Sequence, residues 1–165
     1  MTPTLNGLIL ALLLSATVFI AACGGPSPAN SNTAANSNSP QTNSNAARTN
    51  VEELGMLVNV PYESEEVFWK DDASHKRIVA VLRFPQGESN RLIADAEKIR
   101  PAQNVSVNTE SWFPQELIAQ SEMTGDDTLN GKSYSANAFY QDAFNDGRII
   151  RINDTDYFVL ELNAK

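Results

Sequence analysis

The stretch KRIVAVLRF, Lys76–Phe84, decides how the rest of the chain can fold. Its five middle residues, IVAVL, are all apolar, and three of them are β-branched. An uninterrupted apolar run of this length is typical of a strand that is buried on both of its faces. We therefore expect this segment to be a central strand of a sheet.

Two helices are predicted after this strand, and both begin with a proline. The first begins at Pro85 and ends at Pro101. Proline suits the start because the first helical turn does not need the N–H group that proline lacks. The second begins within WFPQ and ends near Gly125. Between them, NVSVNT (Asn104–Thr109) alternates apolar and polar residues like a half-buried strand. The buried stripe of the first helix is expected at Leu92, Ile93, Ala96 and Ile99.

The chain before the central strand predicts one helix and one strand. NVEELGMLVNVP (Asn50–Pro61) begins with a residue that caps helices well, has two glutamates in its first turn and ends at a proline. EVFWK (Glu66–Lys70) is short, aromatic and β-branched, as strands are, and the DDAS after it is typical of a turn. The apolar face of the helix is expected at Val51, Leu54, Leu57 and Val58.

The last third of the chain predicts three strands. SANAFY (Ser135–Tyr140), GRIIRI (Gly147–Ile152) and DYFVLEL (Asp156–Leu162) are separated by the turn sequences NDG and NDT. In DYFVLEL, the residues Phe158, Leu160 and Leu162 share one face. The fold class that follows is α+β: one small domain with a mixed or antiparallel sheet and two or three helices packed mainly on one face.

Acidic residues dominate the part of the chain that can form a core. From residue 51 onward, 20 acidic and 11 basic residues leave a net charge of −9 in a segment long enough for one domain. This balance argues against nucleic-acid binding, which needs a basic face, and against electrostatic docking on anionic lipid. The single cysteine excludes intrachain disulfides and thiolate-rich metal sites.

That cysteine follows an apolar run near the beginning of the sequence. Leu8–Ala22 contains 15 residues without charge, fewer than the roughly 20 that a transmembrane helix needs, and fits the apolar region of a secretory signal peptide. The run ends in an aliphatic residue and two small ones before the cysteine. This segment, Ile20, Ala21, Ala22 and Cys23, resembles the lipobox of bacterial lipoprotein precursors.

The resemblance implies cleavage before Cys23, diacylglycerol on its sulfur and acylation of the new amino terminus. Two or three acyl chains give a stable membrane anchor, which a single chain does not. Gly24 stands where an aspartate would resemble an inner-membrane retention signal, so the outer membrane is favoured if the cell has two membranes. The preceding MTPTLNG departs from the usual signal peptide because it carries no Lys or Arg.

An Asn/Ser-rich tract follows the cysteine. Gly24–Asn50 contains seven Asn and five Ser, one charged residue and no aromatic residue. Such a composition buries too little apolar surface to offset the entropy of ordering, so a disordered tether with ends roughly 25–30 Å apart is expected. The chain is thus divided into a signal peptide over 1–22, a lipidated cysteine and linker over 23–50, and a globular domain over 51–165.

Few residues of the domain carry recognisable chemistry. His75, the only histidine, follows Asp71 and Asp72; it is either a general base oriented by a carboxylate or, as we favour, an exposed turn residue. Read from its second residue, GDDTLNGKSYSAN (Gly125–Asn137) begins like a calcium loop, but its last residue is Asn where a bidentate Glu is required. We favour a plain loop there and expect no cofactor or metal.

These observations favour a non-catalytic, lipid-anchored module that binds an envelope protein, polymer or small ligand. One alternative is a small hydrolase or acid–base enzyme that uses Asp71, Asp72 and His75. Another is an inhibitor- or immunity-type binder that uses its acidic face against a basic partner. We favour a solvated segment for the acidic run Glu63, Glu65 and Glu66, with recognition of a cation or a basic partner as the alternative. The large aromatic residues are expected mostly in the core, with binding of a partner or a glycan as the alternative: Trp69, Trp112, Phe113 and Tyr134.

Overall fold

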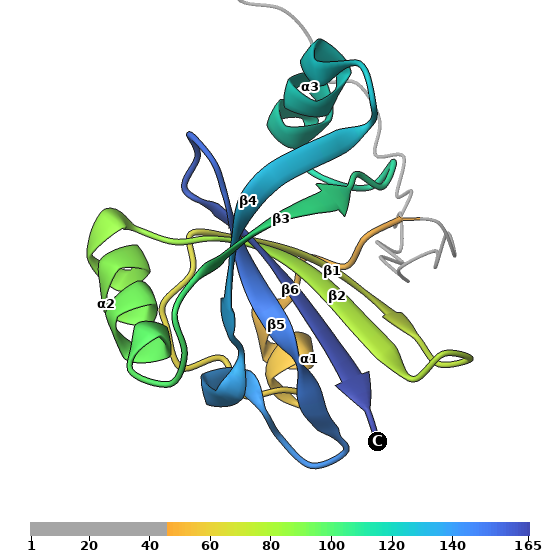
Figure 1. The fold of residues 1–165 in the computed structure, drawn as a ribbon. Coiled ribbons are helices and arrows are strands. Elements are labelled where there is room, and N and C mark those ends of the chain that lie inside the picture. Colours follow the sequence, from red (N-terminus) through yellow and green to blue (C-terminus); the bar gives the residue numbers. More distant parts are fainter. Residues whose placement is uncertain (1–45) are drawn as a thin grey trace, which may run out of the picture. The chain divides into compact units, whose positions relative to one another are not determined.

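The segment KRIVAVLRF forms an interior strand of a six-stranded antiparallel sheet (Figure 1). The structure is a computed structural model and describes residues 46–165. The strand order across the sheet is β1-β2-β6-β5-β4-β3. The strands are β1 (Glu66–Asp72), β2 (Arg77–Arg83), β3 (Gln103–Asn108), β4 (Thr128–Ser135), β5 (Phe144–Ile152) and β6 (Tyr157–Ala164). The helices are α1 (Val51–Gly55), α2 (Gln86–Glu97), α3 (Gln115–Thr124) and the short 3₁₀ helix η1 (Asn137–Phe139).

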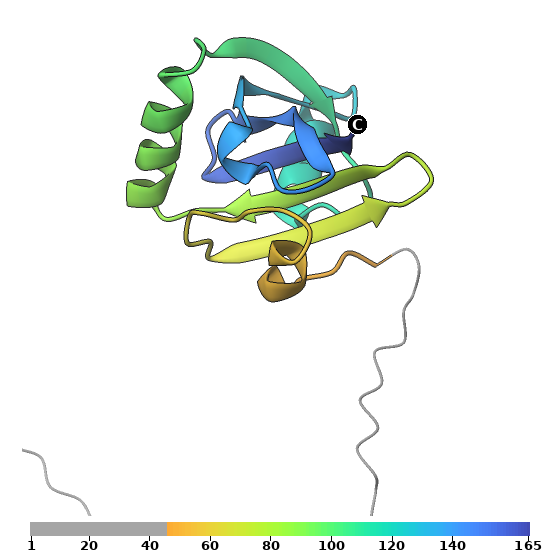
Figure 2. The ribbon, with the colours of Figure 1, turned by 90° about the horizontal axis from the view of Figure 1, so that it is seen from below.

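The sheet carries an apolar core on each of its faces. Side chains of α1, α2 and η1 pack on one face, which we call the α2 face, and those of α3 pack on the other, the α3 face. In Figure 2, α1 lies against the β1–β2 hairpin and α2 stands at the side of the sheet. Two of the three α-helices therefore share a face, and the predicted single α+β domain is confirmed. None of the helices in residues 46–165 has the length and apolar character that crossing a bilayer requires.

Both helices that were expected to begin at prolines do so. α2 and α3 follow Pro85 and Pro114 directly, and α3 ends at Gly125, whose φ of 79° suits glycine. Ile99 was predicted on the buried stripe of α2, but it is 55 % exposed because the helix ends at Glu97. The rest of the stripe is formed, with Leu92 and Ala96 buried and Ile93 half-buried.

The helix predicted over Asn50–Pro61 is much shorter in the structure. Asn50 caps α1 as expected, since its side-chain oxygen accepts the N–H groups of Glu52 and Glu53 at 2.9 and 3.2 Å. The helix ends at Gly55, because glycine is a poor helix former. Further along the chain, Asn59 forms hydrogen bonds with η1 in place of helical ones. Its N–H and its side-chain amide donate to the carbonyls of Phe139 and Ala138, at 3.1 and 2.7 Å. Contacts with η1 therefore replace the last helical turns.

The prediction over residues 125–140 was wrong in both of its parts. The segment TLNGKSYS, predicted as a loop, is β4, and SANAFY, predicted as a strand, contains η1. Asn130 and Gly131 suggested a turn but lie within β4. A Cβ atom on Gly131 would lie 2.4 Å from the Arg151 carbonyl oxygen, so glycine here permits close approach of β4 and β5.

A second glycine contact gives a test of the sheet geometry. Gly147 has a φ of 148°, and a Cβ atom there would lie 2.0 Å from the carbonyl oxygen of Glu161 in β6. We predict that Gly147→Ala lowers the free energy of unfolding by about 2–4 kcal/mol, because it adds backbone strain to a clash. Gly87→Ala, in the open first turn of α2, raises it by about 0.5–1 kcal/mol.

Urea unfolding of the two variants and the unchanged protein measures this difference. Equal stability of Gly147→Ala and Gly87→Ala would contradict the close β5–β6 approach.

Candidate functional site

Two of the residues proposed for acid–base chemistry meet at the β1–β2 hairpin. The Asp72 carboxylate accepts hydrogen bonds from the Ser74 hydroxyl at 2.5 Å and from the Ser74 and His75 backbone N–H groups at 3.0 and 3.1 Å. Nδ1 of His75 lies 2.6 Å from the other oxygen of that carboxylate. These bonds, led by the one from the Ser74 hydroxyl and followed by those from His75, hold the pKa of Asp72 well below its usual range.

The third residue of that group, Asp71, has a different partner. Its Oδ1 atom lies 3.0 Å from a guanidinium nitrogen of Arg48. Asp71 and Asp72 border a groove of about 310 Å³ that His75 does not line. The His75 side chain is 77 % exposed, so the His75–Asp72 pair faces open solvent. The hairpin therefore offers a pair that can exchange a proton with water, outside any enclosed pocket.

The residues that resembled a calcium loop are spread along a strand. Residues 128–135 pair with β3 on one side and β5 on the other, so their side chains alternate between the two faces and do not converge. Oδ1 of Asp126 accepts the Thr124 hydroxyl at 2.8 Å and the Thr128 N–H at 3.3 Å. Among residues 46–165, no group of three or more His, Cys, Asp or Glu is placed to hold a metal ion.

Two residues of the acidic run have partners within the domain, and the large aromatic residues lie in its core. Glu65 and Glu66 lie 3.2 and 2.8 Å from the Arg83 guanidinium, and the Tyr157 hydroxyl donates to Glu66 at 3.0 Å. The four aromatic candidates are core residues, each at most 9 % exposed: Trp69, Trp112, Phe113 and Tyr134.

The predicted lipidation site, Cys23, lies outside the described residues. The domain's contacts begin within the predicted linker, where Ala47 packs against the core of the α3 face and is followed by Arg48. The backbone of Arg48 forms an antiparallel bridge with Trp69 through two hydrogen bonds of 2.9 Å, and its guanidinium lies over the Trp69 ring. The end of the linker thus pairs with the edge strand β1.

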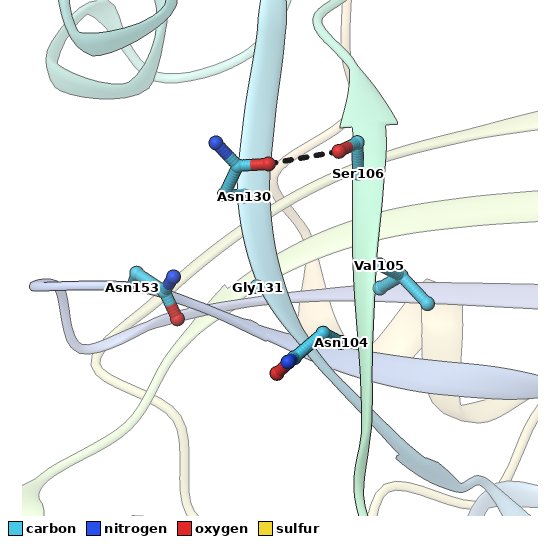
Figure 3. Close-up of a pocket in the computed structure, with 6 residues that line it drawn as sticks. All are labelled: Asn104, Val105, Ser106, Asn130, Gly131 and Asn153. Atoms are coloured by element: carbon cyan, nitrogen blue, oxygen red, sulfur yellow. Dashed lines mark hydrogen bonds between the residues drawn. The ribbon is translucent and has the colours of Figure 1, made fainter.

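A polar cavity lies on the α2 face at the other end of the sheet, between β3, β4 and the end of β5 (Figure 3). This amide pocket has a volume of about 510 Å³ and is open to solvent. Ser106 donates to Oδ1 of Asn130 at 2.8 Å across β3 and β4. Asn153 follows β5, and its N–H donates to the Asn130 carbonyl at 2.9 Å. Its lining residues are Asn104, Val105, Ser106, Asn130, Gly131 and Asn153.

The side chains of the pocket keep most of their hydrogen-bonding capacity. Within the described residues, the side-chain amides of Asn104 and Asn153 form no hydrogen bond, and the Asn130 amide only accepts one. An asparagine amide has two N–H donors and an acceptor oxygen. In Figure 3, Asn104 and Asn153 extend toward the same space, while Val105 points away from it. The pocket can therefore bind a polar ligand through several directed hydrogen bonds.

This pocket was not expected from the sequence. NVSVNT was predicted as a strand but Asn130 as part of a loop, so the two segments were not expected to pair. If TLNGKSYS is read as a strand, its alternating polar residues Asn130 and Lys132 fall on the same face as Asn104 and Ser106. The alternation typical of a strand was therefore present in the sequence, but the Asn130-Gly131 pair, which is typical of a turn, led to the prediction of a loop.

Comparison with known proteins yields no match: no family model fits the chain, and no curated protein or solved structure is detectably similar to it. The function must therefore be inferred from the residues of the candidate sites themselves.

The lowered pKa of Asp72 predicts how the hairpin responds to pH. A carboxyl group whose pKa is lower in the folded than in the unfolded protein stabilises the fold above its unfolded pKa of about 3.9, and this contribution is lost as the pH falls. We therefore expect Asp72→Asn to lower the thermal midpoint at pH 7, and the difference from the unchanged protein to shrink toward pH 2.

The control is Asp142→Asn. Asp142 has a φ of 47°, which asparagine tolerates, and within the described residues its side chain has no hydrogen bond or ion pair. Melting curves at pH 7, 4 and 2 provide the measurement. A gap for Asp72→Asn that stays constant with pH would contradict the ionised, hydrogen-bonded carboxylate.

Proposed function

We propose that this protein is an exported lipoprotein, anchored through Cys23, whose domain is a non-catalytic binding module of the cell envelope. The lipobox-like IAAC and the apolar run before it support the anchor. Lipid on Cys23 attaches the chain to a membrane, for which we favour the outer one in a cell with two membranes. The Asn/Ser-rich linker lets the domain reach roughly 25–30 Å from that membrane.

The observation that carries the binding role is the amide pocket. Binding sites are concave and present a few fixed polar groups that orient the ligand. Asn104, Asn130 and Asn153 come from three different segments of the chain. Their side chains are short, so little rotamer entropy is lost when a ligand is bound. Two of the three side chains are anchored on paired strands, β3 and β4, which fixes their spacing.

A hydrolase or acid–base enzyme is the second candidate, and one contact favours it. The 2.6 Å approach of Asp72 to Nδ1 of His75 orients the imidazole and leaves Nε2 exposed to a substrate. Under this alternative, His75→Ala abolishes hydrolysis of a panel of chromogenic ester and phosphoester substrates, whereas Lys76→Ala, its exposed neighbour, has no effect. Under the binding proposal, neither the unchanged protein nor either variant hydrolyses the panel.

The anchor is tested by metabolic labelling with a clickable fatty acid. We expect label on the unchanged protein, a complete loss of label in Cys23→Ala, and unchanged label in Ser27→Ala, which alters the linker but not the motif. Release of the Cys23→Ala protein from the membrane fraction should accompany the loss, because one cysteine carries the acyl chains. The proposal fails if the unchanged protein takes up no label or if Cys23→Ala remains labelled.

A further inference from the structure

Two basic residues, Lys132 and Arg151, lie beside lining residues of the amide pocket in the strand register, on the same face of the sheet. In the strand register, Lys132 of β4 lies directly opposite Asn104 of β3 on one side and Arg151 of β5 on the other. Tyr134, two residues beyond Lys132, belongs to the core of the α2 face, so Lys132 projects from that face too. Cross-strand neighbours lie about 4.5–5.5 Å apart at Cβ, which places both cations within reach of a ligand in the pocket.

Lys132 and Arg151 have few carboxylates close to them, although the chain has a net charge of −8. No described carboxylate lies within 4 Å of the Lys132 ammonium group. The nearest carboxylate oxygen to Arg151 is that of Asp156, at 3.9 Å. Most other cations of the described residues have a carboxylate oxygen within 3.5 Å: Arg48, Arg77, Arg83, Arg91, Lys98, Arg148 and Lys165.

The walls of the pocket narrow the chemistry of its ligand. Val105 points away from the cavity, and no aromatic residue lines it, so an apolar ligand would gain little there. Side-chain amides pair well with the hydroxyl groups of a sugar, because each supplies donors and an acceptor side by side. Arg and Lys form their strongest hydrogen bonds with carboxylates and phosphates. Two cations on an acidic domain are too few for nucleic acid.

We propose that the amide pocket, together with Lys132 and Arg151, binds a hydroxyl-rich glycan that carries carboxylate groups. The three asparagines bind the sugar hydroxyls, and the two cations bind a carboxylate of the same chain of sugars. This assignment rests on the binding role proposed above and specifies its ligand class. It does not depend on the lipid anchor, because the pocket lies wholly within the described domain.

The probe is an oligogalacturonate of about six units, titrated into the ¹⁵N-labelled full-length chain in detergent at about 0.15 M salt. We expect the side-chain NH₂ signals of Asn104, Asn130 and Asn153 to shift and saturate. Maltohexaose, a neutral glycan of equal length, should bind at least about tenfold more weakly. The double variant Lys132→Gln/Arg151→Gln should also lose about tenfold or more in affinity, as expected for lost charge-assisted hydrogen bonds.

Two further variants separate the site from general electrostatics. Asn104→Asp keeps the shape of the side chain but places a negative charge beside Lys132, so it should abolish binding. Lys76→Gln removes an exposed cation of the β1–β2 hairpin and should leave affinity unchanged. Backbone spectra confirm that each variant is folded.

Three outcomes would overturn the assignment. These are no saturable shift at the three asparagines, equal affinity in the double variant, or tighter binding to poly(glycerol phosphate) than to oligogalacturonate. The fatty-acid label on Cys23 is scored separately, so a failed glycan titration with a labelled protein rejects the ligand class and leaves the anchor standing.

Discussion

The antiparallel pairing of β2 with β6 organises both faces of the sheet. Seven residue pairs join the strands, and apolar side chains leave both strands on both faces. A strand pair that is apolar on two sides must be covered twice, which is why α1 and α2 occupy one face and α3 the other. Glu161 of β6 completes the arrangement, since its two oxygens lie 2.7 and 2.6 Å from the guanidinium groups of Arg77 and Arg148 on the flanking strands.

The polar sites lie at the two edges of the sheet, and at the β3 edge the α2 face extends beyond its apolar core. At one edge, Arg48 covers part of β1, and the hairpin that follows carries the His75–Asp72 contact. At the other edge, Tyr134 is the last residue of β4 whose side chain packs in the core of the α2 face. The side chains of β3 and β4 that lie on this face nearer the pocket are polar. The amide pocket therefore lies where the sheet continues after its helical cover has ended. Its position follows from the same packing that fixes the core.

The sequence specified most of the fold because its strongest patterns belong to the central strands. KRIVAVLRF and DYFVLEL carry enough apolar residues to identify both faces of β2 and β6, and the proline-led helices begin as expected. The errors arose where tertiary contacts override local signals. The helix after Asn50 gives way to hydrogen bonds between Asn59 and η1, and Asn130-Gly131 serves close strand packing instead of a turn. The pocket was missed because it depends on pairing between β3 and β4, a strand that was predicted as a loop.

The β2–β6 pair is expected to be the most stable part of the sheet, and β3, at the edge that carries the amide pocket, to open more easily. Native-state amide hydrogen exchange on the ligand-free protein tests it most directly, because exchange reports the free energy of opening strand by strand. We predict that amides of β2 and β6, such as those of Ala80 and Leu160, exchange only through global unfolding, while those of the edge strand β3 exchange at least a hundredfold faster. Protection of Val105 and Val107 equal to that of Leu160 would contradict the account, since β3 would then belong to the most stable part of the sheet.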